Sequence, residues 1–185
     1  MSSLSIVGIA GSLSAPSSSR RLVDLTLAQI GRRIAADGRV IDIATLGSLA
    51  VHSRDAAGDE LEAALRAVEE ADLVVAATPV YKGSYSGLFK HFVDLLDYRS
   101  LVATPVALLA TGGSERHALM IEHQLRPLFA VFQAQVLGTG LYLTGKDLVD
   151  GKITDPAAES RFDRLVDEAV DALTMRSMAK HSKSA

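Results

Sequence analysis

Serine residues crowd the first loop of the chain, directly after an aliphatic run. The run Leu4–Ala10 is short, continuous and followed by Gly11, which predicts a buried strand. The sequence GSLSAPSSSR comes next and leads into apolar residues with helical spacing. Where a helix begins, free backbone N–H groups and the helix dipole favour an anion, and hydroxyls add donors without bulk. The serines expected to bind that anion are Ser12, Ser14, Ser17, Ser18 and Ser19.

The glycine spacing in this loop excludes two common nucleotide-binding patterns. A Walker A loop needs a second glycine and a lysine, which do not follow Gly11 at the required spacing. The dinucleotide fingerprint G-x-G-x-x-G is also absent, because no third glycine follows Gly8 and Gly11 at the right distance. We therefore expect the loop to hold a compact terminal phosphate, such as that of FMN. A flexible serine-rich linker is the alternative.

A second loop, TPVYKGSYSG, could lie along a flat ligand. Its glycines, Gly83 and Gly87, permit positive φ angles and close approach of the backbone. Lys82 could place a positive charge near the edge of a flavin ring, where reduction deposits negative charge. The candidate residues here are Pro79, Val80, Tyr81, Lys82, Gly83 and Ser84. The alternatives are that Tyr81 and Tyr85 pack as core aromatics and that Lys82 is a solvated surface residue.

A third loop, TGGS, offers the ligand a backbone almost free of side chains. Its residues are Thr111, Gly112, Gly113 and Ser114, and either hydroxyl could cap the helix expected next. A tight turn from strand to helix with no ligand is the alternative. Three unusual loops that follow three strands of one sheet are stronger evidence for a site than any one of them.

Composition narrows the class of protein. We expect one domain over residues 1–176 and a flexible basic tail over 177–185. The net charge is −3 and no basic block precedes the tail, so we expect no nucleic-acid partner. The chain has no cysteine, and its five histidines lack the spacing of a metal site. With no signal peptide and no apolar run of membrane-spanning length, we expect a cytoplasmic protein without a membrane segment.

Strand and helix patterns alternate along the chain, which predicts an α/β fold. Strands are expected over 4–10, 39–43, 71–78, 104–110 and 135–143, the last with a bulge near Gly138 and Gly140. Helices are expected over 19–36, 59–70, 87–97, 114–132 and 157–175, with a turn at 37–38. Such alternation predicts a doubly wound five-stranded parallel sheet with the order 2-1-3-4-5. In that order, ligands bind at the carboxyl ends of the strands, where the three loops lie.

The three loops together resemble a known family. GSLSAPSSSR, TPVYKGSYSGLFKHFVDLL and ATGGSERHALMIEHQLRPLF are similar to segments of the NAD(P)H-dependent FMN reductases, which have the flavodoxin-like fold. The likeness extends over about residues 4–143 and is greatest to the reductases of two-component alkanesulfonate and methanesulfonate monooxygenases. It implies FMN as cofactor, NADPH or NADH as hydride donor, and transfer of reduced FMN to a separate flavin-dependent monooxygenase. It also implies a homodimer or homotetramer.

The resemblance assigns residues to the phosphate and ring of FMN. Ser12, Ser17 and Ser19 match phosphate-loop positions. The segment 79–84 matches the one that runs along the flavin ring, and the segment 111–114 matches the family's second glycine-rich contact. Many relatives have an arginine where this chain has Ser14, so Arg20 is the expected charged phosphate contact. If no arginine reaches the phosphate, FMN should bind more weakly, which suits a flavin used as a substrate.

A proline interrupts the helix expected over 114–132. Pro127 has no N–H, so the carbonyl of His123 loses its helical partner, and the helix must kink or bulge. The resemblance implies a π-bulge aligned with His123 at an interface between subunits. An exposed or simply packed helix histidine is the alternative.

Other functions fit parts of the sequence. A quinone, azo-dye or metal-oxyanion reductase with tightly bound FMN would share the fold and the loops. A flavodoxin-like electron carrier would be strongly acidic and rich in aromatic residues near the flavin, whereas this chain is 5% aromatic and has no tryptophan. A phosphate-binding module without catalysis is the fourth possibility. Hydride transfer to flavin N5 needs positioning and no protein nucleophile, so we assign no acid–base residue.

Overall fold

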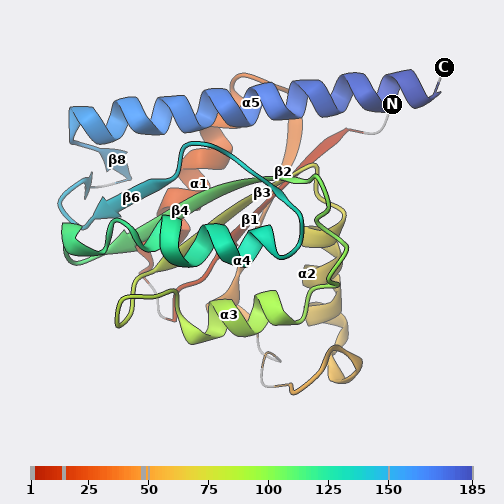
Figure 1. Ribbon diagram of the computed structural model, residues 1–185, viewed down its shortest axis with the longest axis horizontal. Coiled ribbons are helices and arrows are strands. Elements are labelled where there is room, and N and C mark those ends of the chain that lie inside the picture. Colours follow the sequence, from red (N-terminus) through yellow and green to blue (C-terminus); the bar gives the residue numbers. More distant parts are fainter. Residues whose placement is uncertain (1–2, 14–15, 47–48, 50, 150, 185) are drawn as a thin grey trace.

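The computed structural model shows a parallel sheet covered by helices on both faces (Figure 1). It describes residues 3–13, 16–46, 49, 51–149 and 151–184. The strands are β1 (Leu4–Ala10), β2 (Ala36–Asp42), β3 (Leu73–Pro79), β4 (Pro105–Gly112), β5 (Gln135–Val136), β6 (Leu141–Thr144), β7 (Leu148–Val149) and β8 (Lys152–Ile153). The helices are α1 (Ser18–Gly31), α2 (Asp59–Glu69), α3 (Gly87–Asp94), α4 (Arg126–Ala130) and α5 (Pro156–Ser184), with a π-helix over Ile121–Leu125 and 3-10 turns over Ile43–Thr45, Arg54–Ala56 and Glu115–His117.

The strand order β2-β1-β3-β4-β5 confirms the predicted topology. The pairs within this sheet are parallel, and the carboxyl ends of β1, β3, β4 and β6 lie on the same side, at the left in Figure 1. The first strand, Leu4–Ala10, has the predicted bounds. The second strand differs from the prediction, because Asp37 and Gly38 belong to β2 and form no turn. β2 pairs with β1 along the whole length of β1, and this register places Gly38 opposite Ile6.

The predicted fifth strand is two short strands. β5 pairs with the start of β4 and β6 with its end, so both extend the same edge. Between them the backbone N–H and the hydroxyl of Thr139 donate to the Glu168 carboxylate of α5, at 2.8 and 2.6 Å. A Cβ on Gly140 would lie 2.6 Å from Ile121 Cγ2. Contacts with neighbouring helices therefore draw this segment off the ladder.

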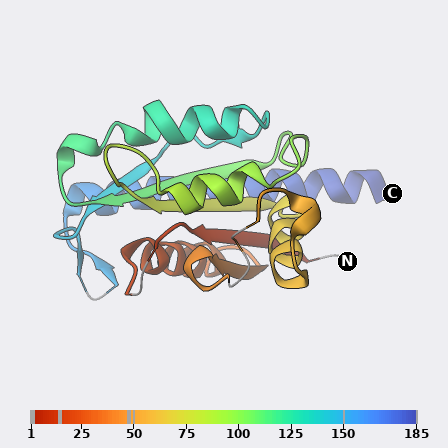
Figure 2. The same cartoon turned by 90° about the horizontal axis from the view of Figure 1, so that it is seen from below.

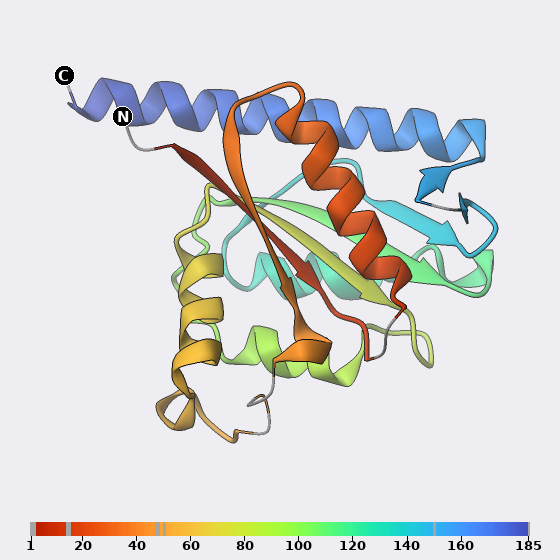
Figure 3. The ribbon, with the colours of Figure 1, turned by 180° about the vertical axis from the view of Figure 1, so that it is seen from behind.

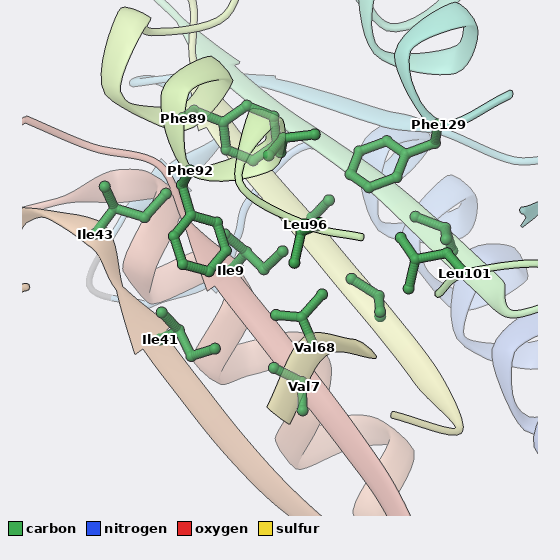
Figure 4. Close-up of a cluster of buried hydrophobic side chains, with 14 of the residues drawn as sticks. Val7, Ile9, Ile41, Ile43, Val68, Phe89, Phe92, Leu96, Leu101 and Phe129 are labelled. Atoms are coloured by element: carbon green, nitrogen blue, oxygen red, sulfur yellow. The ribbon is translucent and has the colours of Figure 1, made fainter. Parts of the chain in front are cut away.

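Each face of the sheet has its own apolar core. On one face, α2, α3 and α4 pack over β-strand residues such as Val7 and Ile9 (Figures 2 and 4). There the rings of Phe89 and Phe129 meet edge to face at 6.4 Å, which joins α3 to α4. On the other face, α1 and α5 bury Leu22, Phe162 and their neighbours against the sheet (Figure 3). Two buried faces explain why the central strands β3 and β4 are mostly continuous runs of buried aliphatic residues, unlike the edge strand β2.

Glycine in β1 lets α1 lie close to the sheet. A Cβ on Gly8 would stand 2.2 Å from Val23 Cγ1 of α1. Gly8 therefore allows α1 to pack directly on β1. The helix ends at Gly31, earlier than predicted, and Arg32 forms its C-cap.

The amino edge of the sheet is closed by an ion-pair cluster. The Asp72 side chain, 3% exposed, lies 2.6 Å from Lys180 Nζ and 3.6 Å from Arg176 Nε, both on α5. The Ser5 backbone N–H donates to the same carboxylate at 3.0 Å. The start of β1 and the end of α5 therefore lie at one end of the molecule (Figure 3).

The C-terminal helix is longer than predicted. It continues from residue 175 through Ser184, into residues that were expected to fray. Arg176 and Lys180 anchor this extension on Asp72, a contact between residues far apart in the sequence. In the described part of the chain, none of the helices combines the length and apolar character needed to cross a bilayer.

Candidate active site

The three predicted loops meet in one pocket at the carboxyl edge of the sheet. The pocket has a volume of about 320 Å³. Its lining residues are Ser12, Pro16, Ser17, Ser18, Ser19, Pro79, Val80, Tyr81, Thr111, Gly112, Gly113, Thr144, Gly145 and Leu148. The structure thus brings together four of the five loop serines, three residues of the second loop and three of the third. Ser14, the fifth serine, lies outside the described residues.

The first loop turns into α1 at this pocket. Ser17 is the N-cap residue, and its hydroxyl accepts a hydrogen bond from the Arg20 backbone N–H at 3.0 Å. The N–H groups of a helix's first turn have no partner within the helix, and the positive end of its dipole lies there. Because Ser17, Ser18 and Ser19 all line the pocket, these groups border the space available to an anion.

The Arg20 side chain is paired with two carboxylates. Its guanidinium lies 3.1 Å from the Asp24 carboxylate and 3.6 Å from that of Asp42, at the end of β2. It is not among the residues that line the pocket. The pairing with Asp24 follows from the i, i+4 spacing on α1. The structure therefore does not bring Arg20 together with the loop serines that line the pocket.

The second loop folds back as a two-residue hairpin. The backbone groups of Tyr81 and Ser84 exchange hydrogen bonds at 2.9 and 3.1 Å, and Lys82 and Gly83 between them have φ angles of 54° and 82°. Two successive positive φ angles are the mark of a tight hairpin turn of type I′. Pro79, Val80 and Tyr81 line the pocket, whereas Lys82 and Gly83 form the tip of the hairpin outside it.

Ser84 ties the hairpin to another part of the structure. Its hydroxyl donates to the Gln124 side-chain oxygen at 3.2 Å, within the π-helix. It does not line the pocket. The structure therefore shows Ser84 in contact with the π-helix, and its place beside a ligand stays a prediction.

Buried hydrogen bonds fix the first loop against the second. The Ser86 hydroxyl donates to the Gly11 carbonyl at 2.6 Å and accepts from the Phe89 backbone N–H at 3.1 Å. Thr78 Oγ1 accepts from the Ser86 N–H at 3.1 Å. A Cβ on Gly11 would lie 2.6 Å from the Phe89 ring. Gly11 therefore allows the first loop to rest directly on α3.

Hydrogen bonds also connect the third loop to the other two. The Val80 backbone N–H donates to the Thr111 carbonyl at 2.7 Å. The hydroxyls of Ser19 and Thr111 lie 3.0 Å apart. Thr111 and Gly112 belong to β4, so only the second half of the predicted TGGS turn lies outside the strand. These hydrogen bonds thus join the third loop to the first and the second.

Tyr142 of β6 supports the end of β4. Its hydroxyl donates to the Ser114 carbonyl at 2.6 Å. A Cβ on Gly112 would lie 2.2 Å from that hydroxyl oxygen, so only glycine leaves room for this contact. Burial raises the pKa of Tyr142, although the hydrogen bond to Ser114 opposes the rise, so the hydroxyl keeps the proton that it donates. Ser114 itself faces a neighbouring cavity instead of this pocket.

Part of the pocket was missed by the sequence analysis. Thr144 is the last residue of β6, Gly145 follows it, and Leu148 begins β7. The Asp147 carboxylate orders this segment, because it accepts from both the N–H and the hydroxyl of Thr144 at 2.7 Å. The signal was available: the threonine and glycine that follow LYL end a strand at the same edge as the other loops.

The chemistry of the lining residues fits a flavin mononucleotide. The residues named above as lining the pocket include no carboxylate and no cation; they offer hydroxyls, backbone amides and short apolar surfaces. Hydroxyl and amide donors at a helix N-terminus suit a phosphate monoester. Pro79, Val80 and Tyr81, opposite Gly112 and Gly113, offer backbone and apolar surface to a flat ring. Within the described residues, no group of three histidine or acidic side chains is placed to hold a metal ion.

The interrupted helix lies beside the second loop. A π-helix spans Ile121–Leu125 and includes His123, and Pro127 follows in the first turn of α4. The Arg126 N–H bonds to the Ile121 carbonyl, five residues back, as a π-helix requires. The bulge thus lies where the sequence analysis placed it. His123 is exposed and does not line the pocket.

Comparison with known sequences points to one family. The family model for NADPH-dependent FMN reductase matches residues 4–148. The NADH-dependent FMN reductase SfnF of Pseudomonas putida is 46% identical over 165 residues, which cover 88% of this chain and 89% of that protein. The FMN reductase (NADPH) of Pseudomonas aeruginosa is 42% identical over 84% of this chain and 85% of its own length.

Solved structures agree with the topology. The apo form of the NADH:FMN oxidoreductase EMOB superposes with a TM-score of 0.82 at 31% identity, over 89% of this chain and 87% of that one. An archaeal flavodoxin superposes with a TM-score of 0.61 at 15% identity, over 91% of this chain and 97% of its own, which shows a shared fold only.

The sheet order, the pocket and these superpositions define a protein with the flavodoxin-like fold and a pocket at the carboxyl edge of the sheet. Within that class, the chain belongs to the NADPH-dependent FMN reductase family. It is therefore an oxidoreductase that uses FMN and a nicotinamide nucleotide.

Proposed function

We propose that the pocket binds FMN with its phosphate at the N-terminus of α1 and its ring between the second and third loops. The observation that carries this proposal is the convergence of Ser17, Ser18 and Ser19 with the segments 79–81 and 111–113 in one pocket. When bound, FMN supplies N5 as the acceptor of a hydride from NADH or NADPH. The chain's own part is to bind and orient the two nucleotides, and positioning alone can account for much of the rate.

The neutral lining of the pocket favours FMN as a substrate that is bound and released in each catalytic cycle. Hydroxyl and amide donors hold the phosphate without a paired cation, because Arg20 is engaged by Asp24 and Asp42. An arginine would add an opposite charge and two parallel N–H···O bonds to the phosphate oxygens, and both would raise the affinity for FMN. A pocket without that contact should release reduced FMN more readily.

Release of reduced FMN implies a consumer. We infer that the protein supplies reduced FMN to a separate flavin-dependent monooxygenase, a sulfonate monooxygenase in the systems that the sequence resembles. We also infer that it works as a homodimer or homotetramer, with the π-helix around His123 and Pro127 at the contact between subunits. Leu119, 64% exposed, stands one turn before His123 and gives this surface an apolar side chain.

A reductase with tightly bound FMN is the second candidate. A relative named NADPH azoreductase, from a Bacillus species, is 27% identical over 65% of this chain. The two candidates differ in where the flavin resides between turnovers: in solution for the first, in the pocket for the second.

An absorbance assay tests the proposal. Purified protein is mixed with NADH or NADPH, with and without added FMN. The loss of absorbance at ~340 nm reports oxidation of the nucleotide. We expect oxidation that depends on added FMN and saturates with it. Protein that purifies with stoichiometric flavin and reduces a quinone or azo dye, but not free FMN, would support the second candidate. No oxidation under any of these conditions would contradict both.

A further inference from the structure

A second cavity adjoins the proposed flavin pocket. It has a volume of about 520 Å³. Its lining residues are Gly113, Ser114, Glu115, Arg116, Thr144, Gly145 and Lys146. Gly113, Thr144 and Gly145 line both spaces, so a ligand in this cavity would lie next to one in the flavin pocket.

The second cavity carries charge that the flavin pocket lacks. Arg116 follows the third loop and Lys146 follows β6, so two separate segments each bring one cation to the same space. Glu115 is the one carboxylate among its lining residues, which leaves the cavity net positive. On a chain with a net charge of −3, this is a local concentration of positive charge.

Both cations are available to a ligand. Within residues 3–13, 16–46, 49, 51–149 and 151–184, the side chains of Arg116 and Lys146 form no ion pair, and both residues are exposed. Other arginines are engaged: Arg54 bonds to Glu62 and Glu69, and Arg126 to Glu122. An unpaired arginine and lysine at one cavity are suited to a phosphate, which arginine can bind through two N–H groups.

The segments that carry these cations are ordered by internal contacts. The Arg116 N–H donates to the Ser114 hydroxyl at 3.3 Å, and Tyr142 holds the Ser114 carbonyl. On the other side, the Thr154 hydroxyl donates to the Lys146 carbonyl at 3.0 Å. The backbone positions of the two cations are therefore set before a ligand arrives, which reduces the entropy lost on binding.

We propose that Arg116 and Lys146 bind a phosphate group of the nicotinamide dinucleotide and thereby position it beside the flavin. The inference rests on the proposed function, because it takes the adjoining pocket as the flavin site. The phosphate is either the pyrophosphate, which NADH and NADPH share, or the 2′-phosphate, which only NADPH carries. Glu115 can accept a hydrogen bond from a ribose hydroxyl of the same ligand.

Steady-state kinetics of Arg116→Ala, Lys146→Ala and the double variant test this assignment. KM is measured for NADH and NADPH at saturating FMN, and for FMN at saturating nucleotide. We expect each single substitution to raise the nucleotide KM about tenfold, the loss of one hydrogen bond to a charged group, with the KM for FMN nearly unchanged. Arg116→Lys should recover part of the loss, because it keeps the charge but not the fork of donors.

Arg32→Ala is the matched control. Arg32 is an exposed arginine at the C-cap of α1, at the opposite edge of the sheet, so its removal changes the net charge by the same amount. A rise in KM for both nucleotides in the Arg116 and Lys146 variants would assign the pyrophosphate, and a rise for NADPH alone would assign the 2′-phosphate. Unchanged nucleotide KM values, an equal rise in Arg32→Ala, or a rise in the KM for FMN instead would overturn the inference.

A titration without turnover separates this inference from the proposed function. Calorimetric titration of NADP⁺ into the wild type and the double variant reads the phosphate contact directly. Weaker binding of NADP⁺ by the double variant supports the assignment, whether or not the wild type reduces FMN. A wild type that reduces no FMN would contradict the proposed function but not this assignment. Equal binding by the two proteins contradicts the assignment even if FMN is turned over.

Discussion

Polar groups at the two edges of the sheet differ in whether they are paired within the chain. At the amino edge, the buried Asp72 carboxylate is satisfied within the chain by Ser5, Arg176 and Lys180. At the carboxyl edge, the helix N-terminus at Ser17 and the exposed Ser18 border an open pocket. Polar groups at the amino edge are thus paired within the fold, whereas donors at the carboxyl edge border a pocket. A polar residue that is buried and fully paired is explained by stability, whereas donors around a pocket are better explained by binding.

Gly11→Ala should have the largest effect, because it acts on the fold and on the site together. The new Cβ would lie 2.6 Å from the fully buried Phe89 ring, so the ring or the first loop must shift. Overpacking of this kind costs about 3 kcal/mol of unfolding free energy at the upper end of its usual range. Chemical denaturation and FMN titration should both change. A stable variant with normal FMN affinity would show that the contact between the first loop and α3 is not needed.

Asp72→Asn should destabilise the protein and leave the site intact. The variant loses the charge that Lys180 and Arg176 contact, which should lower the unfolding free energy by about 2 kcal/mol. The KM for FMN should not change, because the substitution lies at the far edge. A changed KM with unaltered stability would reverse the roles that we give to the two edges.

The pH dependence of stability sharpens the Asp72 prediction. Burial alone would raise the pKa of Asp72, but hydrogen bonds from Lys180 and the Ser5 N–H outweigh it and hold the pKa below its ordinary value of 3.8. A carboxyl group with a lowered folded-state pKa stabilises the protein above its unfolded pKa and loses that effect as the pH falls. The stability difference between wild type and Asp72→Asn should therefore be constant near neutral pH and shrink below 3.8. A difference that grows in acid would contradict the assignment.

Ser18→Ala should weaken flavin binding without a cost in stability. Ser18 lines the pocket and is exposed, whereas Ser17 also caps α1, so Ser18 separates binding from folding. Loss of one hydrogen bond to the phosphate should reduce FMN affinity about tenfold. Fluorescence titration of FMN measures the affinity, and thermal unfolding is the control. Unaltered affinity would argue against a phosphate at the start of α1.

Arg20→Ala should have the smallest effect. The Arg20 side chain, 39% exposed, pairs with Asp24 and Asp42 outside the pocket. Exposed ion pairs contribute between zero and about 1 kcal/mol. Both the unfolding free energy and FMN affinity should stay close to those of the wild type. A loss of affinity as large as that of Ser18→Ala would mean that Arg20 turns to the phosphate when FMN binds.

Local patterns predicted the elements that local physics determines. Leu4–Ala10 is aliphatic and bounded by glycine, and its limits were predicted correctly. Pro127 lacks an N–H, so an interruption of the helix before it could be expected. The sheet order followed from the alternation of strands and helices. The clustering of the three loops followed in turn from that order.

Contacts between distant residues could not be predicted in the same way. The tail seemed polar and basic in isolation, yet Arg176 and Lys180 stay helical because they reach Asp72. Arg20 was predicted to contact the phosphate, but in the structure its guanidinium forms an ion pair with Asp42, at the end of β2. Asp37 and Gly38 have the composition of a turn, and only the register with β1 makes them part of a strand.

The decisive experiment is a crystal structure of the protein grown with FMN. We expect the phosphate at the first turn of α1, beside Ser17, Ser18 and Ser19. It places the ring between the segments 79–81 and 111–113. FMN bound at another surface, or in this pocket with its phosphate far from α1, would contradict the account.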